Sequence, residues 1–250
     1  MDTPPPDPSL PARLAMVENQ LRRRGIRDSR VLDAMTTVPR HRFLPPNLTR
    51  SAYEDSALPA GEGQTISQPY IVAHMTEDLR LEPHHLVLEI GTGTGYQTAI
   101  LAELVPHGHV YTIERIPALA LAARQHLANY SNISFHIGDG SLGWPICEGL
   151  GVRGQGLAEE TPASPPNPYP LTPPIFHRIL ITAGAPAREP QPLLDQLALG
   201  GIMIIPEGAL ASQTLCSVTR TGPGPDDFRR APLLPCRFVP LLGQFAWPED

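Results

Sequence analysis

Apolar and polar residues along this chain form two repeating patterns, one typical of buried strands and one typical of helices. Stretches that are apolar at nearly every position predict strands covered on both faces, and an apolar residue every three or four positions predicts a helix. In the larger part of the chain, the predicted strands cover 87–90, 109–114, 133–137, 176–182, 202–206, 214–219 and 237–241, and the predicted helices cover 97–104, 117–129 and 191–199. Because strands and helices alternate, we expect an α/β fold with a mostly parallel central sheet flanked by helices, and a ligand at the carboxyl ends of the strands.

The first 81 residues have a different pattern, which predicts a helical addition to this core. Leu14, Val17 and Leu21 fall on one face of a helix. In order, we predict a helix over 12–24 ended by Gly25, a helix capped by Asp28 and ended by Pro39, an extended connector over 39–45, a long structured loop over 51–70 and a helix over 71–81. Long structured loops in compact domains are often functional.

Composition predicts one domain with irregular ends and one irregular internal segment. The amino-terminal residues are rich in proline, which cannot enter a helix interior, and they have little apolar surface to bury. Residues 148–174 carry many Pro and Gly residues and almost no periodic apolar pattern, so we predict an inserted surface loop. The predicted division is a disordered tail at 1–11, a single domain at 12–243 that consists of a helical and loop region (12–81) and a ligand-binding core (82–243), the insertion at 148–174, and a tail at 244–250.

Charge and composition exclude several classes of function. The formal net charge is −6, whereas binding to nucleic acid needs clustered Lys and Arg, so we expect no nucleic-acid partner. No apolar run approaches the roughly 20 residues of a membrane helix, and the amino terminus lacks the features of a signal peptide. The three cysteines are widely spaced and indicate neither a disulfide framework nor a zinc site. We therefore expect a cytoplasmic, monomeric protein without membrane attachment.

Two histidine pairs, His84–His85 and His107–His109, raise the question of a bound metal. Both pairs fall in predicted connections, and neither has a third ligand at a useful spacing. We therefore expect surface histidines and no metal site.

One stretch, residues 87–97, carries the clearest sign of chemistry. An apolar strand runs into Gly91, Gly93 and Gly95, and a helix begins directly afterwards. Glycine permits a positive φ and lets a ligand approach the backbone, and the start of a helix offers free N–H groups. The pattern therefore predicts a strand, a tight glycine loop and a helix that together bind a polar ligand.

The residues around the glycine loop narrow the class of ligand. The next predicted strand ends at Glu114, and an acidic residue in that place commonly binds ribose hydroxyls. A dinucleotide fingerprint would need glycine at position 96, where this chain has Tyr96. The motif, with Glu89 just before it, instead resembles the nucleoside-binding loop of S-adenosylmethionine (SAM) methyltransferases.

Several separated blocks give a more specific resemblance, to the protein-L-isoaspartate (D-aspartate) O-methyltransferase family. The likeness runs from about Met16 to Gly243 and leaves out 148–174. Its most specific part is Gly-Gln-Thr-Ile-Ser-Gln-Pro-Tyr-Ile-Val-Ala at 63–73. The other blocks are Arg-Val-Leu-Asp-Ala-Met…Val-Pro-Arg-His-Arg-Phe (30–43), Val-Leu-Glu-Ile-Gly-Thr-Gly-Thr-Gly-Tyr-Gln (87–97), Tyr-Thr-Ile-Glu-Arg (111–115), Gly-Asp-Gly (138–140), Arg-Ile-Leu-Ile-Thr-Ala-Gly-Ala-Pro (178–186) and Arg-Phe-Val-Pro-Leu (237–241).

The resemblance implies a fold, a reaction and a set of site residues. The fold would be the Rossmann-like SAM-dependent methyltransferase fold. The reaction would transfer the SAM methyl group to the α-carboxyl of L-isoaspartyl, and also D-aspartyl, residues in damaged proteins, which leaves S-adenosyl-L-homocysteine. The implied site consists of Ser67 as the active-site residue, Thr65, Ile66 and Ser67 at the substrate, and Glu89, Gly91, Thr92, Gly93, Gly95, Glu114, Asp139 and Gly140 at the cofactor. The chain departs from the family at the insertion and at His177, where Asp is common; His177 would enter its strand at the end away from the ligand.

The proposed chemistry does not need a general base. An α-carboxyl group titrates near roughly 3.5 and is already ionised at neutral pH. The protein must mainly align carboxylate oxygen, methyl carbon and sulfur and exclude water, and a neutral hydroxyl such as Ser67 suits this better than a cation, which would over-stabilise a charge that the transition state loses. Ser67 has no nucleophile-elbow motif around it, which argues against covalent catalysis.

Alternatives remain open for single residues and for the function. Ser67 could instead cap the following helix, Asp139 could cap the next turn, and Glu89 could support the glycine loop rather than lie near the methionine end of the cofactor. Rival functions are SAM-dependent methyl transfer to another carboxylate or a small molecule, and a SAM-binding adaptor without catalysis. An NAD-dependent oxidoreductase is disfavoured by Tyr96.

Overall fold

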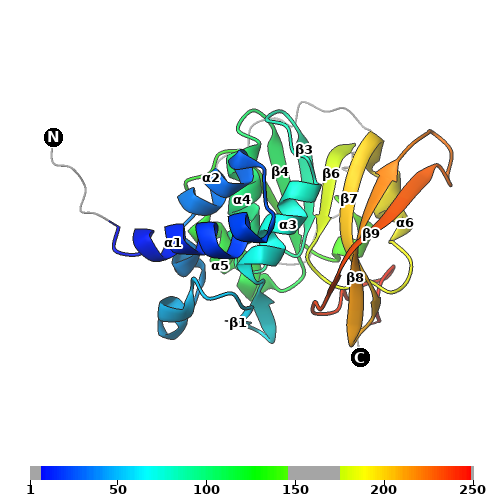
Figure 1. The fold of residues 1–250 in the computed structure, drawn as a ribbon. Helices are drawn as coiled ribbons and strands as arrows, with labels where there is room; N and C mark the ends of the chain where they lie inside the picture. Colours follow the sequence, from blue (N-terminus) through cyan, green and yellow to red (C-terminus); the bar gives the residue numbers. More distant parts are fainter. Residues whose placement is uncertain (1–6, 146–174, 249–250) are drawn as a thin grey trace.

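A seven-stranded sheet forms the centre of the molecule in the computed structural model, which describes residues 7–145 and 175–248 (Figure 1). The strand order is β5-β4-β3-β6-β7-β8-β9; β5 to β7 run parallel, and β8 and β9 are antiparallel to their neighbours. The strands are β3 (Leu86–Ile90), β4 (His109–Glu114), β5 (Ile133–Ile137), β6 (Phe176–Ile181), β7 (Leu197–Ala209), β8 (Ser212–Arg220) and β9 (Phe228–Cys236). The mostly parallel α/β sheet predicted from the sequence is thus confirmed.

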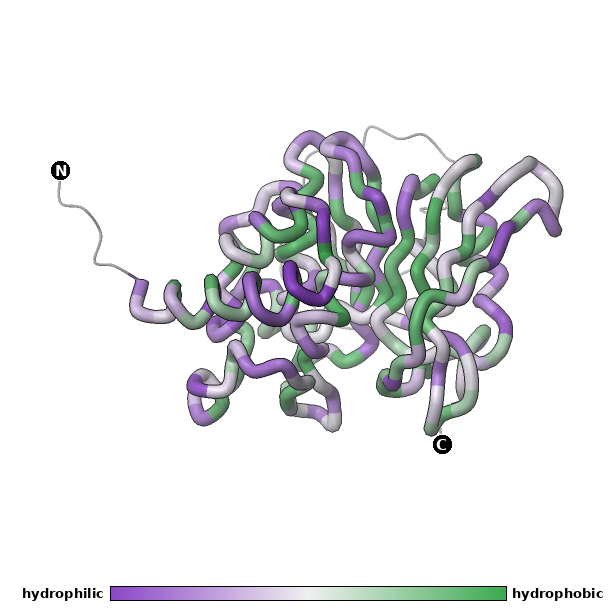
Figure 2. The backbone as a smooth tube through the Cα atoms, viewed as in Figure 1, coloured by the Kyte–Doolittle hydropathy of each residue, from purple (hydrophilic) through white to green (hydrophobic). Residues whose placement is uncertain are grey.

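Both faces of this sheet are buried, which explains why its strands are apolar at nearly every position. Along β3, Val87 belongs to one hydrophobic cluster and Leu88 to the other, and along β7, Ile204 and Met203 divide in the same way. Side chains of a strand alternate between faces, so each strand contributes to two cores. Figure 2 shows hydrophobic residues concentrated along these strands and hydrophilic residues on the connecting loops.

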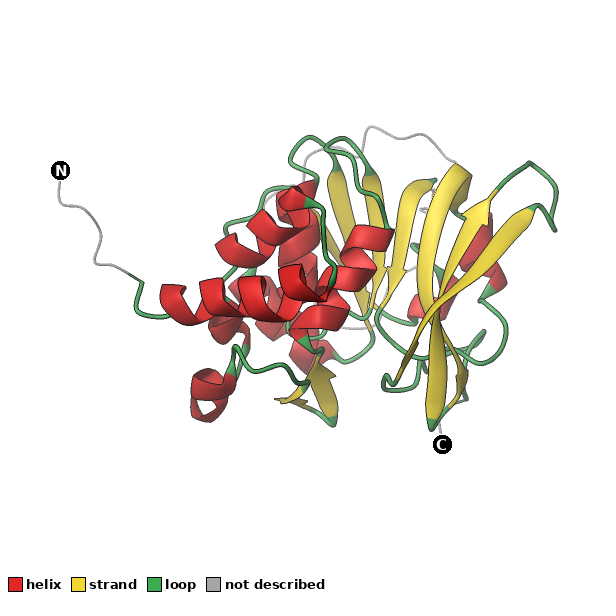
Figure 3. Ribbon diagram, in the orientation of Figure 1, coloured by secondary structure: helices red, strands yellow, loops and turns green. Residues whose placement is uncertain are grey.

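Helices cover both faces, unequally (Figure 3). The helices of the described part of the chain are α1 (Leu10–Met16), α2 (Ser29–Thr37), α3 (Pro69–Asp78), α4 (Tyr96–Leu104), α5 (Pro117–His126) and α6 (Gln191–Asp195). Helices α1 to α5 lie on one side of the sheet and α6 on the other. The helical addition before the core therefore packs against the same face as α4, which follows the glycine loop.

The first helix differs from its prediction in length and in its buried face. It begins at Leu10 and changes at Val17 into a wider π-helical turn, and Gly25 ends the helical segment with a φ of 105°. Of the predicted buried face, Val17 and Leu21 are buried, whereas Leu14 is 48% exposed and Met16 is buried instead. Residues 7–11 are ordered here, and residues 1–6 and the predicted insertion at 148–174 lie outside the described residues.

Two segments predicted as a connector and a loop contain regular structure. The 39–45 connector holds a 3₁₀ turn, Arg40–Phe43, in which Arg40 and Phe43 are buried. The 51–70 loop contains a two-stranded hairpin, β1 (Leu58–Gly61) and β2 (Gln64–Ile66). The hairpin strands are only four and three residues long, too short for a clear period-two pattern in the sequence.

Two predictions near the end of the chain were wrong. The helix predicted over 191–199 stops at Asp195, and β7 begins at Leu197 with a bulge around Gly200, whose φ is 73°. The last strand is β9 rather than 237–241. Two prolines within β9 concealed it, because proline cannot donate to a strand ladder; an edge strand such as β9 tolerates them.

His85 and His177 form a stacked pair at the amino-terminal ends of β3 and β6, with ring centroids 5.0 Å apart. Nδ1 of His85 accepts the Glu82 N–H, and Nδ1 of His177 accepts the Leu86 N–H, each at 3.0 Å. His85 is buried, so the expectation of a surface histidine was wrong there. Among residues 7–145 and 175–248, no group of three His, Cys, Asp or Glu side chains could hold a metal ion.

This pair predicts a loss of stability in mild acid. Burial and the charge of Arg178 lower the pKa of His85 to about 4, and they also lower the pKa of His177. An unfolded histidine titrates near roughly 6.5, so between these values the unfolded chain binds more protons than the folded chain. The neutral histidines therefore contribute fully to the free energy of unfolding above about pH 6.5, and this contribution decreases as the pH approaches 4. For His85 the loss is on the order of 2 kcal/mol.

Urea unfolding at pH 7 and pH 5 measures this loss. In His85→Asn the amide oxygen can accept the Glu82 N–H without titrating. The free energy of unfolding of this variant should therefore differ less between pH 7 and pH 5 than that of the wild type. An equal difference in the wild type and in His85→Asn would show that another group causes the acid sensitivity.

Candidate active site

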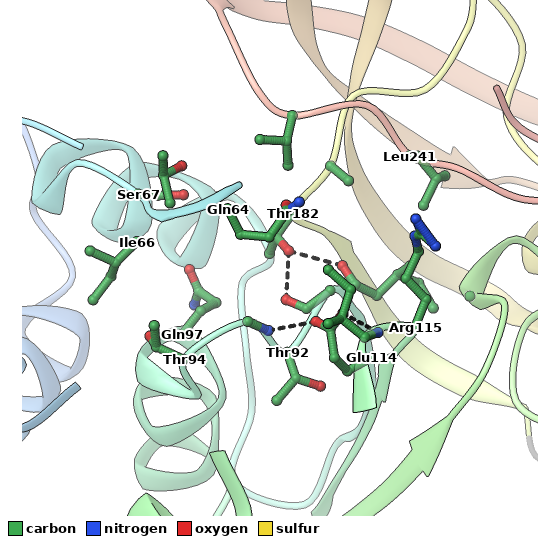
Figure 4. A pocket seen from close by; sticks show the side chains of 18 of the residues that line it. Gln64, Ile66, Ser67, Thr92, Thr94, Gln97, Glu114, Arg115, Thr182 and Leu241 are labelled. Atoms are coloured by element: carbon green, nitrogen blue, oxygen red, sulfur yellow. Dashed lines mark hydrogen bonds between the residues drawn. The ribbon is translucent and has the colours of Figure 1, made fainter. Parts of the chain in front are cut away.

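A cleft opens at the carboxyl ends of β3, β4 and β6 and encloses about 1010 Å³, its open mouth included. Figure 4 shows Glu114 and Arg115 at one end, Ile66 and Ser67 at the other, and Gln64 and Thr182 between them. The wall between the helical addition and the sheet comes from α3 and α4, through Met75 and Gln97 among others. The helical addition and the core therefore build the cleft together.

The glycine loop has a backbone that only glycine fits well. Gly91 has a φ of 95°, and an added Cβ would lie 2.4 Å from Oγ1 of Thr182. That hydroxyl donates to the Gly91 carbonyl oxygen at 2.7 Å, which fixes the loop against the end of β6. Gly95 has a φ of 90° and precedes α4 directly. The loop thus brings bare backbone and a helix start to the cleft.

Glu114 connects the glycine loop to the end of β4. One carboxylate oxygen accepts the Gly93 N–H at 2.8 Å, and the other accepts the Ile116 N–H at 2.9 Å. Each oxygen has a second lone pair, so the carboxylate can also accept two hydroxyl groups from a ligand. Ile90, Ile113 and Ile116 add apolar surface beside it. This end of the cleft fits a nucleoside, with its ribose at Glu114.

Glu89 lies beneath the loop and does not line the cleft. Thr98 and Thr112 donate their hydroxyls to its Oε2, each at 2.6 Å, and Oε1 has no partner among the described residues. Burial raises the pKa of Glu89 to about 7. The Thr112 hydroxyl is 2.6 Å from that of Thr92, which does line the cleft. The contacts of Glu89 are those of a residue that supports the loop.

Ser67 lies where the hairpin meets α3. Gln68, not Ser67, is the residue before this helix, and no side chain caps it. The capping alternative for Ser67 is therefore wrong. Among the described residues its hydroxyl has no hydrogen-bond partner, and the side chain lines the cleft. A hydroxyl donor is thus available at the end of the cleft away from Glu114.

A buried arginine that the sequence did not single out holds the backbone of Ser67. Arg40 is 0% exposed, and its guanidinium donates to the carbonyl oxygens of Ala52 (2.8 Å), Ser67 (2.8 Å) and Ser56 (3.4 Å). It also lies 5.2 Å from the centre of the Tyr96 ring. Burial lowers the pKa of Arg40. One side chain therefore connects three parts of the 51–70 segment to the start of α4.

Asp139 caps the turn that follows β5, which was the alternative to cofactor contact that the sequence left open. Its Oδ1 accepts the Ser141 N–H at 2.8 Å, so it caps the turn after β5, and its Oδ2 accepts the Gln244 N–H at 2.7 Å. It borders a depression beside the cleft rather than the cleft itself. Contact between Asp139 and the cofactor stays a prediction.

The last described residues pass over this side of the molecule. Gly184 donates its N–H to the Val239 carbonyl oxygen (2.7 Å), and its own carbonyl oxygen accepts the Leu241 N–H (2.9 Å) and the Trp247 ring N–H (3.1 Å). Residues 239–242 line the cleft. The segment over 244–247, predicted as a tail, is hydrogen-bonded to the core.

Most of the predicted site residues come together in the cleft. The structure places Thr65, Ile66, Ser67, Gly91, Thr92, Gly93, Glu114 and Gly140 in its lining, and Glu89, Gly95 and Asp139 outside it. Three further residues line the cleft and were not predicted from the sequence, namely Gln97, Thr182 and Leu241. Thr182 and Leu241 occur in blocks that carry the family resemblance, which was the available signal; Gln97 ends the glycine block.

The mostly parallel sheet, the glycine loop and the acid that ends β4 form a nucleoside-binding cleft in a Rossmann-like fold, which is the fold class of SAM-dependent methyltransferases. The model of the Protein-L-isoaspartate(D-aspartate) O-methyltransferase (PCMT) family matches residues 12–148 and 169–246. The chain belongs to this family.

Individual relatives agree with the family match. A Protein-L-isoaspartate O-methyltransferase of Magnetococcus marinus is 47% identical over 246 residues, which cover 98% of this chain and 94% of the relative. A Protein-L-isoaspartate O-methyltransferase 2 of Geotalea uraniireducens is 47% identical over 241 residues, covering 96% and 97%. A solved structure named protein-L-isoaspartate O-methyltransferase superposes with a TM-score of 0.73 at 25% identity, over 94% of this chain and 67% of that chain. A Plasmodium falciparum structure in complex with S-adenosyl-L-homocysteine shares the fold, with a TM-score of 0.70 at 22% identity over 92% and 98% of the two chains.

Proposed function

We propose that this chain transfers the methyl group of SAM to the α-carboxyl of L-isoaspartyl residues in damaged proteins, and of D-aspartyl residues as the family description indicates. The observation that carries the proposal is the pairing within one cleft of a nucleoside end at Glu114 and a free hydroxyl donor at Ser67. Family membership supports the same reaction.

The residues at the Ser67 end suit a carboxylate nucleophile. SAM supplies an electrophilic methyl group when bound. The acceptor carboxylate is ionised at neutral pH, so no side chain has to remove a proton. Ser67 can donate one hydrogen bond to the carboxylate oxygen that does not attack, and it thereby orients the other oxygen. A single neutral donor leaves the attacking oxygen reactive, because a stronger cationic partner would stabilise the ground state more than the transition state.

The proposal also covers the partners, the location and the oligomeric state of the enzyme. Isoaspartyl-containing proteins are the partners, and we expect the enzyme to act in the cytoplasm as a monomer. Within the described residues, no helix is long and apolar enough to cross a membrane.

Two peptides that differ only in isoaspartate against aspartate at one position, together with labelled SAM, test the reaction. We expect methyl ester on the isoaspartyl peptide alone. Ser67→Ala should lower kcat/KM by roughly 10- to 100-fold, since a hydrogen bond to a charged group contributes about 1.5–3 kcal/mol. Its affinity for SAM should be unchanged, and Ser212→Ala, an exposed serine outside the cleft, serves as the matched control.

Three results would contradict this assignment in different ways. Ester on both peptides would remove the isoaspartyl specificity. Ester on neither, with SAM still bound, would move the function to another acceptor or to binding alone. Full activity of Ser67→Ala would remove only the role of Ser67.

A further inference from the structure

A second depression, here called the groove, leads away from the Ser67 end of the cleft. The two share Thr65, Ser67, Thr182 and Val239 in their linings. The groove continues between the segment before β1, at Asp55 and Ser56, and the end of β9 with the residues after it. A polypeptide whose isoaspartyl carboxylate reaches Ser67 therefore has a path along the groove.

Two charged residues line the groove, Asp55 and Arg237, and only Asp55 has an ion-pair partner among the described residues. Asp55 is already compensated, since its Oδ2 accepts from Nη1 of Arg24 at 2.7 Å and its Oδ1 accepts from Nε2 of Gln68 at 2.8 Å. Arg24 is itself held, with its guanidinium carbon 3.7 Å from the centre of the Tyr70 ring.

Arg237, on the opposite wall, is exposed and has no ion pair or hydrogen bond to another described residue. Its neighbour Phe238 is fixed, because the Phe238 N–H donates to Oε1 of Gln213 at 2.7 Å. The wall that carries Arg237 is thus anchored, while its charge is available. The groove presents one uncompensated positive charge next to the acceptor end of the cleft.

We propose that Arg237 selects peptides with an acidic side chain close to the isoaspartyl residue, by pairing with that carboxylate in the groove. This inference rests on the proposed function and adds to it a preference among substrates. An exposed ion pair is weak, so the expected preference is roughly two- to fivefold in kcat/KM. It should decrease with added salt, because exposed charges are screened.

The test uses isoaspartyl peptides with Glu, Gln or Lys at each position flanking the isoaspartate. On at least one side, the wild type should methylate the Glu peptide with the highest kcat/KM and the Lys peptide with the lowest. Arg237→Gln should remove this order, and Arg237→Glu should reverse it. Arg229→Gln removes an exposed arginine of β9 outside the groove, so this control should keep the wild-type order.

The outcomes separate this inference from the function on which it rests. No ester on any isoaspartyl peptide would overturn the proposed function. Ester on all peptides with equal kcat/KM in the wild type, or an unchanged preference for Glu in Arg237→Glu, would overturn the role of Arg237 alone. Because Arg237 is exposed and unpaired, neither substitution removes a hydrogen bond or ion pair between described residues.

Discussion

Replacing Arg40 with Met should lower kcat/KM for an isoaspartyl peptide by about 100-fold or more, because a misplacement of about 1 Å at a reacting group can cost this much. Arg40 donates to the carbonyl oxygen of Ser67 and to two other carbonyls of the 51–70 segment, so its loss releases the backbone that carries the hydroxyl donor. The affinity for SAM should change by no more than about threefold, since Arg40 makes no hydrogen bond to Glu114 or to Gly91, Gly93 and Gly95, where we expect SAM to bind.

Arg40→Met should also destabilise the protein. Carbonyl groups left buried without a donor cost roughly 1–3 kcal/mol each, and the relief from burying a charge offsets part of this cost. We expect a net loss of about 2–4 kcal/mol in the free energy of unfolding.

Two matched variants separate the hydrogen bonds of Arg40 from its positive charge and from the general effect of losing an arginine. Arg40→Lys keeps the charge but cannot reach three carbonyl oxygens at once, so it should recover stability more than turnover. Arg42→Met removes an exposed arginine two positions away and should resemble the wild type. Steady-state kinetics, calorimetric titration with S-adenosyl-L-homocysteine and urea unfolding supply the three readouts. A folded Arg40→Met with wild-type kcat/KM would end this assignment.

Replacing Glu114 with Ala should weaken binding of SAM and S-adenosyl-L-homocysteine by about 100-fold or more. Each hydroxyl that donates to a carboxylate contributes about 1.5–3 kcal/mol, and the ribose has two such hydroxyls. The same carboxylate holds the N–H groups of Gly93 and Ile116, so the variant also loses two bonds that shape the loop.

Calorimetric titration of S-adenosyl-L-homocysteine measures this effect directly. Glu114→Gln keeps one acceptor oxygen and should lie between the wild type and Glu114→Ala. Glu103→Gln removes an acid of α4 that does not line the cleft and should bind normally. A dissociation constant within about threefold of the wild type for Glu114→Ala would place the ribose elsewhere in the cleft.

The pattern of residues was sufficient to predict the core of the fold and the residues at the Glu114 end of the cleft. Strands buried on both faces are apolar throughout, and a glycine loop between a strand and a helix needs residues that are adjacent in the chain. Glu114 could be predicted because the ends of neighbouring parallel strands meet at one edge of the sheet. The position of Ser67 came from the family resemblance, since its free hydroxyl has no local signature.

The contacts that hold the Ser67 end of the cleft could not be predicted from the sequence. Arg40 reaches carbonyl oxygens 12, 16 and 27 positions along the chain. Backbone carbonyls are present at every residue, so no side-chain pattern identifies those that accept. Asp139 meets a backbone N–H 105 positions away, at Gln244, which is why residues predicted as a tail close one side of the molecule. Local sequence patterns predict the secondary structure of a segment, whereas contacts between distant segments form only when the chain folds.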